Sequence, residues 1–100
     1  MYNSKMIAEF EQDLKNDDLT VLDVRELDEY NNGHINNALH LPLSQISELV
    51  KDLDSSKHYH VICHSGGRSA MACEFLSAHG FDVTNVMGGM SAWKGEVAFD

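Results

Sequence analysis

Short apolar runs alternate with amphipathic stretches along the chain, and this alternation gives the first expectations about the fold. Residues 20–24 (TVLDV), 58–63 (HYHVIC) and 81–87 (FDVTNVM) are short apolar runs, which predict buried strands. Residues 38–42 (ALHLP) predict a briefer strand, because Pro42 stops it.

Between these runs, apolar residues recur at helical spacing and predict helices. The predicted helices are residues 4–16, a short helix that starts at Glu26, residues 44–53, and residues from about 69 to 79. Ser4 and Ser44 are the predicted N-caps of the first and third helices, and Gly80 is a suitable terminator of the last. Because strands that alternate with helices form βαβ units, we predict an α/β domain whose sheet is mostly parallel and carries helices on both faces.

The size and composition fit one domain that spans residues 1–100, with 43% hydrophobic and 23% charged residues. No apolar run approaches the roughly 18 residues of a membrane span. The acidic amino-terminal stretch also does not resemble a signal peptide. A net charge of −9 argues against nucleic acid and anionic membranes as partners. We therefore expect a cytoplasmic protein that binds neither.

Positive charge is concentrated in one stretch of this acidic chain. No acidic residue lies between Asp54 and Glu74, an interval that holds Lys57, Arg68 and three histidines. Such a stretch suits a small anionic ligand, although a chain with 16 acids in 100 residues also has gaps by chance.

The cysteines and histidines do not form a pattern that suggests a disulfide framework or a metal site. Cys63 and Cys73 are the only two cysteines, and we expect both to be reduced. Cys73 falls on the buried face of the last predicted helix, where packing is favoured over a role as a second reacting thiol. The six histidines and two cysteines lack the spacing of a zinc site, so no metal is expected.

The stretch CHSGGRS (residues 63–69) is the strongest candidate for chemistry. Sites in parallel α/β sheets lie at the carboxyl ends of strands, and Cys63 is at such an end. Gly66 and Gly67 would let the backbone N–H groups of the loop converge as an anion nest, at which the following helix directs its partial positive charge. A thiol held there should have a lowered pKa and act as a nucleophile. The alternative, a small buried residue that merely ends a strand, leaves the glycines and Arg68 unexplained.

We therefore take Cys63 as the candidate catalytic residue. The candidate ligand-binding residues are the rest of the loop: His64, Ser65, Gly66, Gly67, Arg68 and Ser69.

Three separated segments resemble the rhodanese-like sulfurtransferases. Residues 22–42 (LDVRELDEYNNGHINNALHLP) are similar to the family segment D-V-R-x-x-x-E-Y-x-x-G-H-I-x-x-A-x-x-x-P. CHSGGRS resembles the family's Cys-x-x-x-x-Arg-Ser loop, and residues 80–93 (GFDVTNVMGGMSAW) resemble its closing segment. Together the segments lie within roughly residues 20 to 94.

The resemblance implies a three-layer fold with a small, mostly parallel sheet of about five strands and helices on both faces. It also implies that Cys63 carries a persulfide between two half-reactions, without a cofactor. The partners it implies are a small sulfur-donor anion such as thiosulfate and a thiol or cyanide acceptor, or a protein that donates or accepts sulfur.

Residues 22–42 also contain candidates for supporting roles. Asp23 and Arg25 are expected to form an ion pair that supports the site, and the alternative is that they face the substrate. Glu29, Tyr30 and His34 are expected to tie loops together through hydrogen bonds.

Two positions depart from the family pattern. His64 stands where many relatives carry a second arginine, so a positive charge there depends on protonation. Asn37 stands where glycine is common, and we interpret it as a variation in a turn.

Two other functions stay open at this point. Phosphatases and arsenate reductases also use a Cys…Arg anion loop, but they generally place five residues between the two, whereas this chain has the four residues 64–67. The shorter loop favours a single bound sulfur over a tetrahedral oxyanion. The second alternative is a persulfide carrier that docks on a protein partner, with thiosulfate turnover only incidental.

Overall fold

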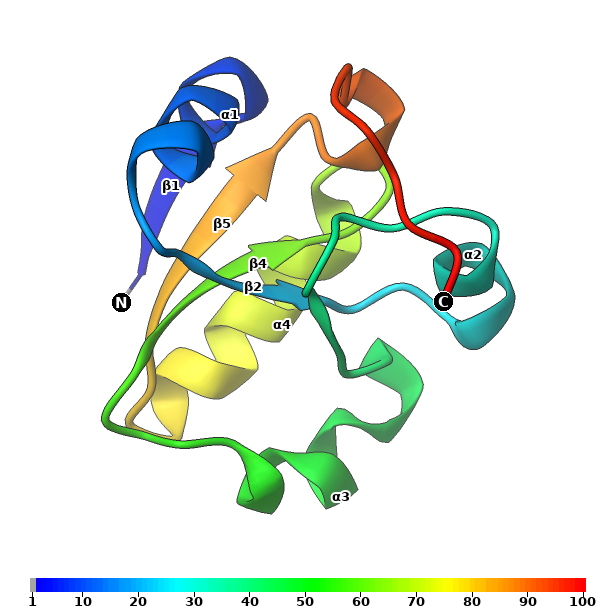
Figure 1. The fold of residues 1–100 in the computed structure, drawn as a ribbon. Coiled ribbons are helices and arrows are strands. Elements are labelled where there is room, and N and C mark those ends of the chain that lie inside the picture. Colours follow the sequence, from blue (N-terminus) through cyan, green and yellow to red (C-terminus); the bar gives the residue numbers. More distant parts are fainter. Residues whose placement is uncertain (1) are drawn as a thin grey trace.

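The computed structural model describes residues 2–100 and contains one five-stranded, all-parallel sheet. The strands are β1 (Asn3–Met6), β2 (Thr20–Asp23), β3 (Leu39–His40), β4 (His58–Ile62) and β5 (Asp82–Met87), in the spatial order β1-β5-β4-β2-β3 (Figure 1). The α/β fold with a parallel sheet, predicted from the sequence, is therefore confirmed. The two central pairings, β2 with β4 and β4 with β5, bring the carboxyl ends of three strands to one edge of the sheet.

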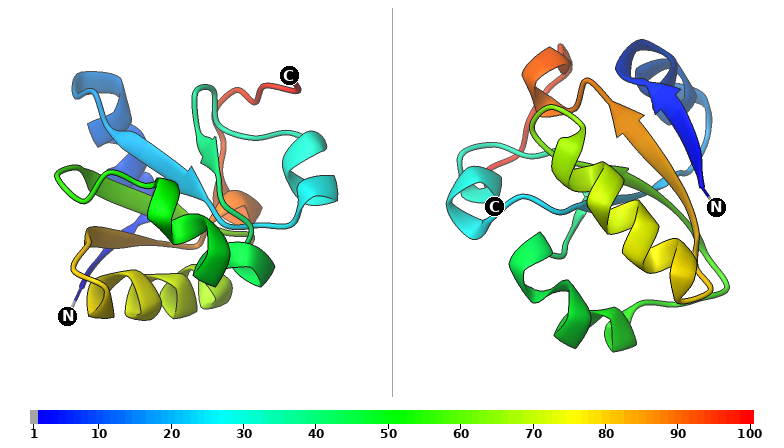
Figure 2. Two further views of the ribbon diagram at one scale, coloured as in Figure 1. Left: turned by 90° about the horizontal axis from the view of Figure 1, so that it is seen from below. Right: turned by 180° about the vertical axis from the view of Figure 1, so that it is seen from behind.

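Helices cover both faces of this sheet. They are α1 (Ile7–Asn16), α2 (Leu27–Asn31), α3 (Ile46–Leu49) and α4 (Gly67–Ala78). In the left view of Figure 2, α3 and α4 lie on one side of the sheet and α1 lies on the other. Two buried clusters separate the three layers, one around Tyr59 and Leu76 beneath α4, and one around Phe10 and Val86 beneath α1.

The amino-terminal segment differs from the expectation of a single helix over residues 4–16. Its first residues form β1, which pairs in parallel with β5, and α1 begins only at Ile7. Ser4 is thus in a strand and does not cap the helix, whose N-cap residue is Met6. The prediction failed here because β1 is an edge strand whose side chains are mostly exposed, so that backbone pairing rather than an apolar pattern determines its structure.

The predicted helix over residues 44–53 is broken into three short pieces. A 3-10 turn at Leu43–Gln45 and another at Val50–Asp52 flank α3. The Ser44 side chain caps no helix, since its hydroxyl donates a hydrogen bond of 2.8 Å to Oε1 of Glu26. The last helix agrees better with the sequence, although it begins at Gly67, two residues before the predicted start.

No helix within residues 2–100 is long and apolar enough to cross a membrane.

Candidate active site

The loop between β4 and α4 lies at the carboxyl edge of the sheet, directly after Ile62. In the right view of Figure 2 this loop is beside the 3-10 turn Met90–Ala92, which follows β5. Cys63 is therefore at the position predicted for it, between a central strand and the start of α4. Its side chain is almost fully buried, at 1% exposure, whereas His64 and Ser65 are exposed.

The sulfur of Cys63 accepts hydrogen bonds from the loop that follows it. The backbone N–H groups of Gly66 and Ser69 lie 3.1 Å and 3.2 Å from Sγ, and Oγ of Ser69 lies 3.3 Å from it. Burial by itself would raise the pKa of the Cys63 thiol, but hydrogen bonds from Ser69, Gly66 and Ser65 outweigh it and lower the pKa. The loop thus stabilises negative charge on this sulfur.

Gly66 makes the tight turn that allows this convergence. It has φ of +112°, in the left-handed region that favours glycine, and it is the N-cap residue of α4. A backbone conformation that favours glycine was also predicted for Gly67, and that prediction is wrong. Gly67 is the first residue of α4, is absent from the positive-φ glycines, and has open space around the position of a Cβ atom.

The turn after β5 supports the loop from the side. The backbone N–H of Met90 donates a 2.8 Å hydrogen bond to the carbonyl oxygen of Cys63, and the N–H of Ser91 donates one of 2.7 Å to that of His64. Gly89 has φ of +53°, and a Cβ atom there would lie 2.3 Å from the Cys63 carbonyl oxygen. Gly89 is therefore a site residue that sequence reasoning missed, although the paired glycines at 88–89 were part of the family resemblance.

Arg68 is bound to α2. Its Nη1 and Nη2 atoms lie 2.6 Å and 2.8 Å from the two carboxylate oxygens of Glu29, a bidentate ion pair. The hydrogen bond from Arg68 lowers the pKa of Glu29 to about 2, and the pair raises the pKa of Arg68. The positive charge predicted for the loop is thus largely paired, and Arg68 fastens the start of α4 to α2. This contact also agrees with the loop-tying role expected of Glu29.

Asp23 and Arg25 form the expected ion pair. The Nη2 atom of Arg25 lies 2.8 Å from Oδ2 of Asp23, and both side chains are buried. The same Nη2 donates to the carbonyl oxygen of Gly33 at 2.9 Å. The pair therefore ties the end of β2 to the segment after α2, which favours the supporting role over contact with a substrate.

Tyr30 and His34 also join segments. Their rings stack with centroids 3.7 Å apart, and the Tyr30 hydroxyl donates a 2.7 Å hydrogen bond to the carbonyl oxygen of Ala38. The nearby turn contains Asn37 with φ of +68°, a conformation that glycine and asparagine adopt most readily. This conformation fits the interpretation of Asn37 as a variation in a turn.

Asn85 on β5 is the second contributor to the site that the sequence did not reveal. Its Oδ1 atom is 2.5 Å from Oγ of Ser69, and both residues are buried beneath the Cys63 sulfur. A polar residue within an apolar strand was the available signal, since most buried polar side chains have a specific partner. Ser69, predicted to bind ligand, thus has its side chain directed toward Cys63 and β5.

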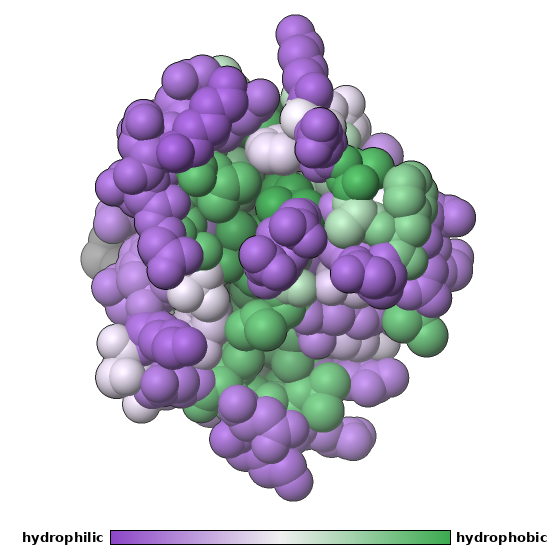
Figure 3. All heavy atoms as spheres, in the orientation of Figure 1, coloured by the Kyte–Doolittle hydropathy of each residue, from purple (hydrophilic) through white to green (hydrophobic). Residues whose placement is uncertain are grey.

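A hollow of about 430 Å³ lies away from this loop, between α1 and the C-terminal segment. Figure 3 shows apolar side chains in the hollow and hydrophilic ones around it. Its apolar lining includes Leu14, Leu19, Val21, Ile35 and Trp93. None of its lining residues belongs to residues 63–69.

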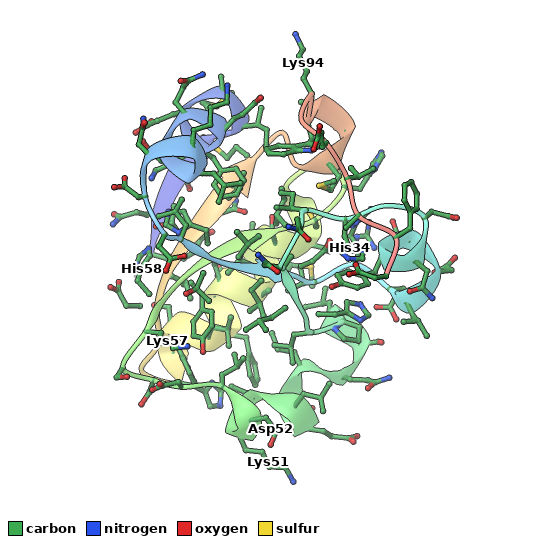
Figure 4. The ribbon with its side chains drawn as sticks, in the orientation of Figure 1. His34, Lys51, Asp52, Lys57, His58 and Lys94 are labelled. Carbon is green, nitrogen blue, oxygen red and sulfur yellow. The ribbon has the colours of Figure 1, made fainter. Side chains whose placement is uncertain are left out.

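A polar cluster lies near the amino-terminal end of β4, where Figure 4 shows Lys57 and His58 on the opposite side of the ribbon from His34. The Nε2 atom of His60 is 3.3 Å from Nζ of Lys5, and burial together with this charge lowers the pKa of His60 to about 4. Within residues 2–100 no group of three histidine, cysteine or acidic side chains is arranged to hold a metal ion. The contact between Lys5 and His60 links β1 to β4.

Comparison with known proteins assigns the chain and its fold to one family. The sequence model of the rhodanese-like domain family matches residues 6–96 of this chain. The putative sulfurtransferase YtwF of Bacillus subtilis is 44% identical over 80 residues, which are 80% of this chain and 78% of that protein. Thiosulfate sulfurtransferase GlpE of Coxiella burnetii is 35% identical over 82 residues, covering 81% of this chain and 77% of that protein.

The putative sulfur carrier protein YrkF of Bacillus subtilis is 39% identical over 89 residues, and the match covers 87% of this chain but only 48% of YrkF. Among solved structures, a rhodanese-related protein of Thermoplasma volcanium has a TM-score of 0.90 at 39% identity, over 99% of this chain and all of that one. Fold, loop and comparisons agree, and the chain belongs to the rhodanese-like domain family of sulfurtransferases.

Proposed function

We propose that this chain transfers a sulfane sulfur from an anionic donor such as thiosulfate to a thiol or cyanide acceptor, through a persulfide on Cys63. The observation that carries the proposal is the set of hydrogen bonds on the Cys63 sulfur, from N–H groups 3.1 Å and 3.2 Å away. They lower the pKa of the thiol despite its burial, and the thiolate is the form of cysteine that attacks sulfur. The names of YtwF and GlpE support the same reaction class.

The reaction consists of two displacements at sulfur. In the first, the Cys63 thiolate attacks the outer sulfur of thiosulfate; an S–S bond forms, the bond to the sulfonate sulfur breaks, and sulfite leaves with the electron pair. In the second, cyanide or a thiolate attacks the outer persulfide sulfur, and Cys63 leaves as the thiolate. Neither step requires a metal or an organic cofactor, and the order predicts ping-pong kinetics.

The loop residues divide into three groups in this proposal. His64 and Ser65 are exposed and stand at the mouth of the loop, so they would contact the oxygens of the donor. Gly66 and Ser69 donate to the reacting sulfur and would stabilise the thiolate. Arg68 orders the loop through Glu29, and Gly67 begins α4.

The four-residue spacing supports sulfur rather than phosphate chemistry. In this loop the N–H groups of Gly66 and Ser69 already converge on Sγ itself, so the nest is filled by the cysteine sulfur. A phosphatase needs the corresponding donors to surround a tetrahedral oxyanion above the sulfur.

Steady-state kinetics test the proposal. Thiosulfate and cyanide should give thiocyanate with parallel double-reciprocal lines, and Cys63→Ser should abolish turnover because serine cannot carry the persulfide. An aryl phosphate should give no phosphate above the Cys63→Ser background. Intersecting lines or full activity in Cys63→Ser would reject the covalent route, and phosphate release by wild type would support the phosphatase alternative instead.

The name of YrkF favours one variant of this function, a sulfur carrier that serves a protein partner. Under this variant the persulfide forms in the same way, but a protein thiol removes its sulfur far faster than cyanide does. Single-turnover transfer from persulfidated protein to cyanide, a small thiol and a candidate protein acceptor separates the two variants.

We also propose a cytoplasmic location and a single domain as the acting unit.

A further inference from the structure

The hydroxyl group of Ser69 has more neighbours than it can satisfy with one proton. Its Oγ atom lies 3.3 Å from Sγ of Cys63, 3.1 Å from the carbonyl oxygen of Gly66 and 2.5 Å from Oδ1 of Asn85. Ser69 is fully buried and Asn85 is 4% exposed, so bulk water does not reach this network freely. A serine hydroxyl donates one hydrogen bond and accepts up to two.

When Cys63 is a thiol, the network can be satisfied in one direction. The S–H group donates to Oγ of Ser69, and Ser69 donates to Oδ1 of Asn85, its nearest acceptor. The Nδ2 group of Asn85 then faces the carbonyl oxygen of Gly66 at 3.5 Å, the long limit of a hydrogen bond. Each donor has one acceptor in this arrangement.

When Cys63 is a thiolate, the same arrangement fails. The sulfur can only accept, so the Ser69 proton is needed at Sγ, and Oγ would then face Oδ1 of Asn85 with no hydrogen between them. Two oxygen atoms at 2.5 Å without a proton repel each other. A half-turn of the Asn85 amide removes the conflict, because Nδ2 then donates to Oγ while Ser69 donates to sulfur. The turn replaces the 3.5 Å contact of Nδ2 with the Gly66 carbonyl oxygen by a contact of Oδ1 with the same oxygen, which is looser than the 2.5 Å conflict that the turn relieves.

We propose that Asn85 is a positioning residue whose amide takes one orientation for the thiol of Cys63 and the other for its thiolate, and that it thereby directs the Ser69 proton to the sulfur when the nucleophile ionises. Asn85 acts through Ser69 and touches no substrate. Resting on the proposed function, the inference extends to the persulfide. There the negative charge moves to the outer sulfur, Sγ needs fewer donors, and the Ser69 proton returns to Oδ1 of Asn85.

The other groups that act on Cys63 are separate from this network. Arg68 and Cys73 on α4 interact electrostatically with Cys63, and Arg68 is itself paired with Glu29 of α2. His64 follows Cys63 in the loop and is exposed. β5 contributes the uncharged Asn85 at this point. Exchange of Asn85 for an apolar residue therefore changes no charge around the sulfur.

A double-mutant cycle on the ionisation of the Cys63 thiol tests the inference. The thiol pKa is measured from the pH dependence of alkylation by iodoacetamide in wild type, Asn85→Leu, Ser69→Ala and the double variant. Leucine keeps the branch at Cγ, although it is larger than asparagine, and it has no polar atom, so the Ser69 proton is left to the Gly66 carbonyl oxygen, 3.1 Å from Oγ. We expect Asn85→Leu to raise the pH midpoint of alkylation, that is, the measured pKa of the thiol. Because less thiolate is then present at pH 7, alkylation at that pH should slow by about three- to tenfold. In the Ser69→Ala background the same exchange should have no further effect.

Thr84→Val is the matched control, because Thr84 is also buried on β5 and its hydrogen bond goes to His58. It should leave the midpoint unchanged even if it lowers stability. Should Asn85→Leu fail to fold, Asn85→Ala replaces it in the cycle. An unchanged midpoint in the Asn85 variant, or equal shifts with and without Ser69, would overturn the inference. Because alkylation requires no sulfur donor, this outcome is independent of whether Cys63 forms a persulfide.

Discussion

Replacement of Gly89 by alanine is expected to lower the free energy of unfolding by about 3 kcal/mol and to disorder the Cys63 loop. A Cβ atom at this position would lie 2.3 Å from the carbonyl oxygen of Cys63 and 2.7 Å from that of His64, both backbone atoms that cannot turn aside. The positive φ of +53° adds the strain of a left-handed conformation for alanine. Separation of the turn from the loop would relieve the contact, at the expense of the hydrogen bonds from Met90 and Ser91.

Chemical denaturation and the alkylation rate of Cys63 measure the two effects. Gly67→Ala is the matched control, since a Cβ atom there meets nothing within 4 Å and alanine is favoured in a helix by up to about 1 kcal/mol. The control should be neutral or slightly stabilising. A Gly89→Ala protein with the stability and alkylation rate of wild type would show that the turn does not support the loop.

The second large effect is expected at the ion pair between Arg68 and Glu29. Arg68→Ala should slow the reaction with thiosulfate by about tenfold, because α4 loses its attachment to α2 and the loop loses order. Its effect on stability should be smaller, about 1 kcal/mol, since both side chains are about one third exposed.

Glu29→Gln distinguishes the two roles that Arg68 could have. If Arg68 acts by fastening the loop, loss of the carboxylate should also slow the reaction, although Glu29 is not a donor-binding residue. If Arg68 instead binds the donor directly, release from Glu29 should leave kcat/KM unchanged or raise it. The measured quantity is kcat/KM for thiosulfate in both single variants and in the double variant, in which effects that arise from one contact should not add.

The pH dependence of stability gives the same pair an independent signature. The pKa of Glu29 is lowered to about 2 from an ordinary value of 4.5. A lowered carboxyl pKa means that the unfolded chain binds the proton more readily, so the stabilisation is present above pH 4.5 and is lost as the pH falls toward 2. Glu29→Gln should lack this part of the acid transition.

The sequence predicted the features of the fold that arise from apolar patterns. The strands around Val21, Val61 and Val83 are buried on both faces, so their apolar runs were unambiguous. β1 was missed because its side chains are mostly exposed and its structure depends on pairing with β5, which is distant in sequence. The helix over residues 44–53 was predicted as continuous because its spacing is helical, but the chain there alternates between 3-10 and α-helical turns.

The candidate site shows the same division between local and long-range information. Cys63 and Gly66 act through a turn that their own neighbours define, and the sequence placed them correctly. The contacts of Gly89, Asn85 and Glu29 with the loop link residues that lie far apart in the chain. Spacing alone could not reveal them, because only the order of strands in the sheet brings β5 and α2 to the carboxyl end of β4.

Intact-mass measurement after incubation with thiosulfate tests the persulfide on Cys63 most directly. The loop that lowers the Cys63 pKa should make this sulfur the nucleophile, so wild type should gain a single adduct of about 32 Da that cyanide or dithiothreitol removes. Cys63→Ala retains Cys73, which is fully buried, and should gain nothing. A wild-type mass that does not change, or the same adduct in Cys63→Ala, would contradict the account.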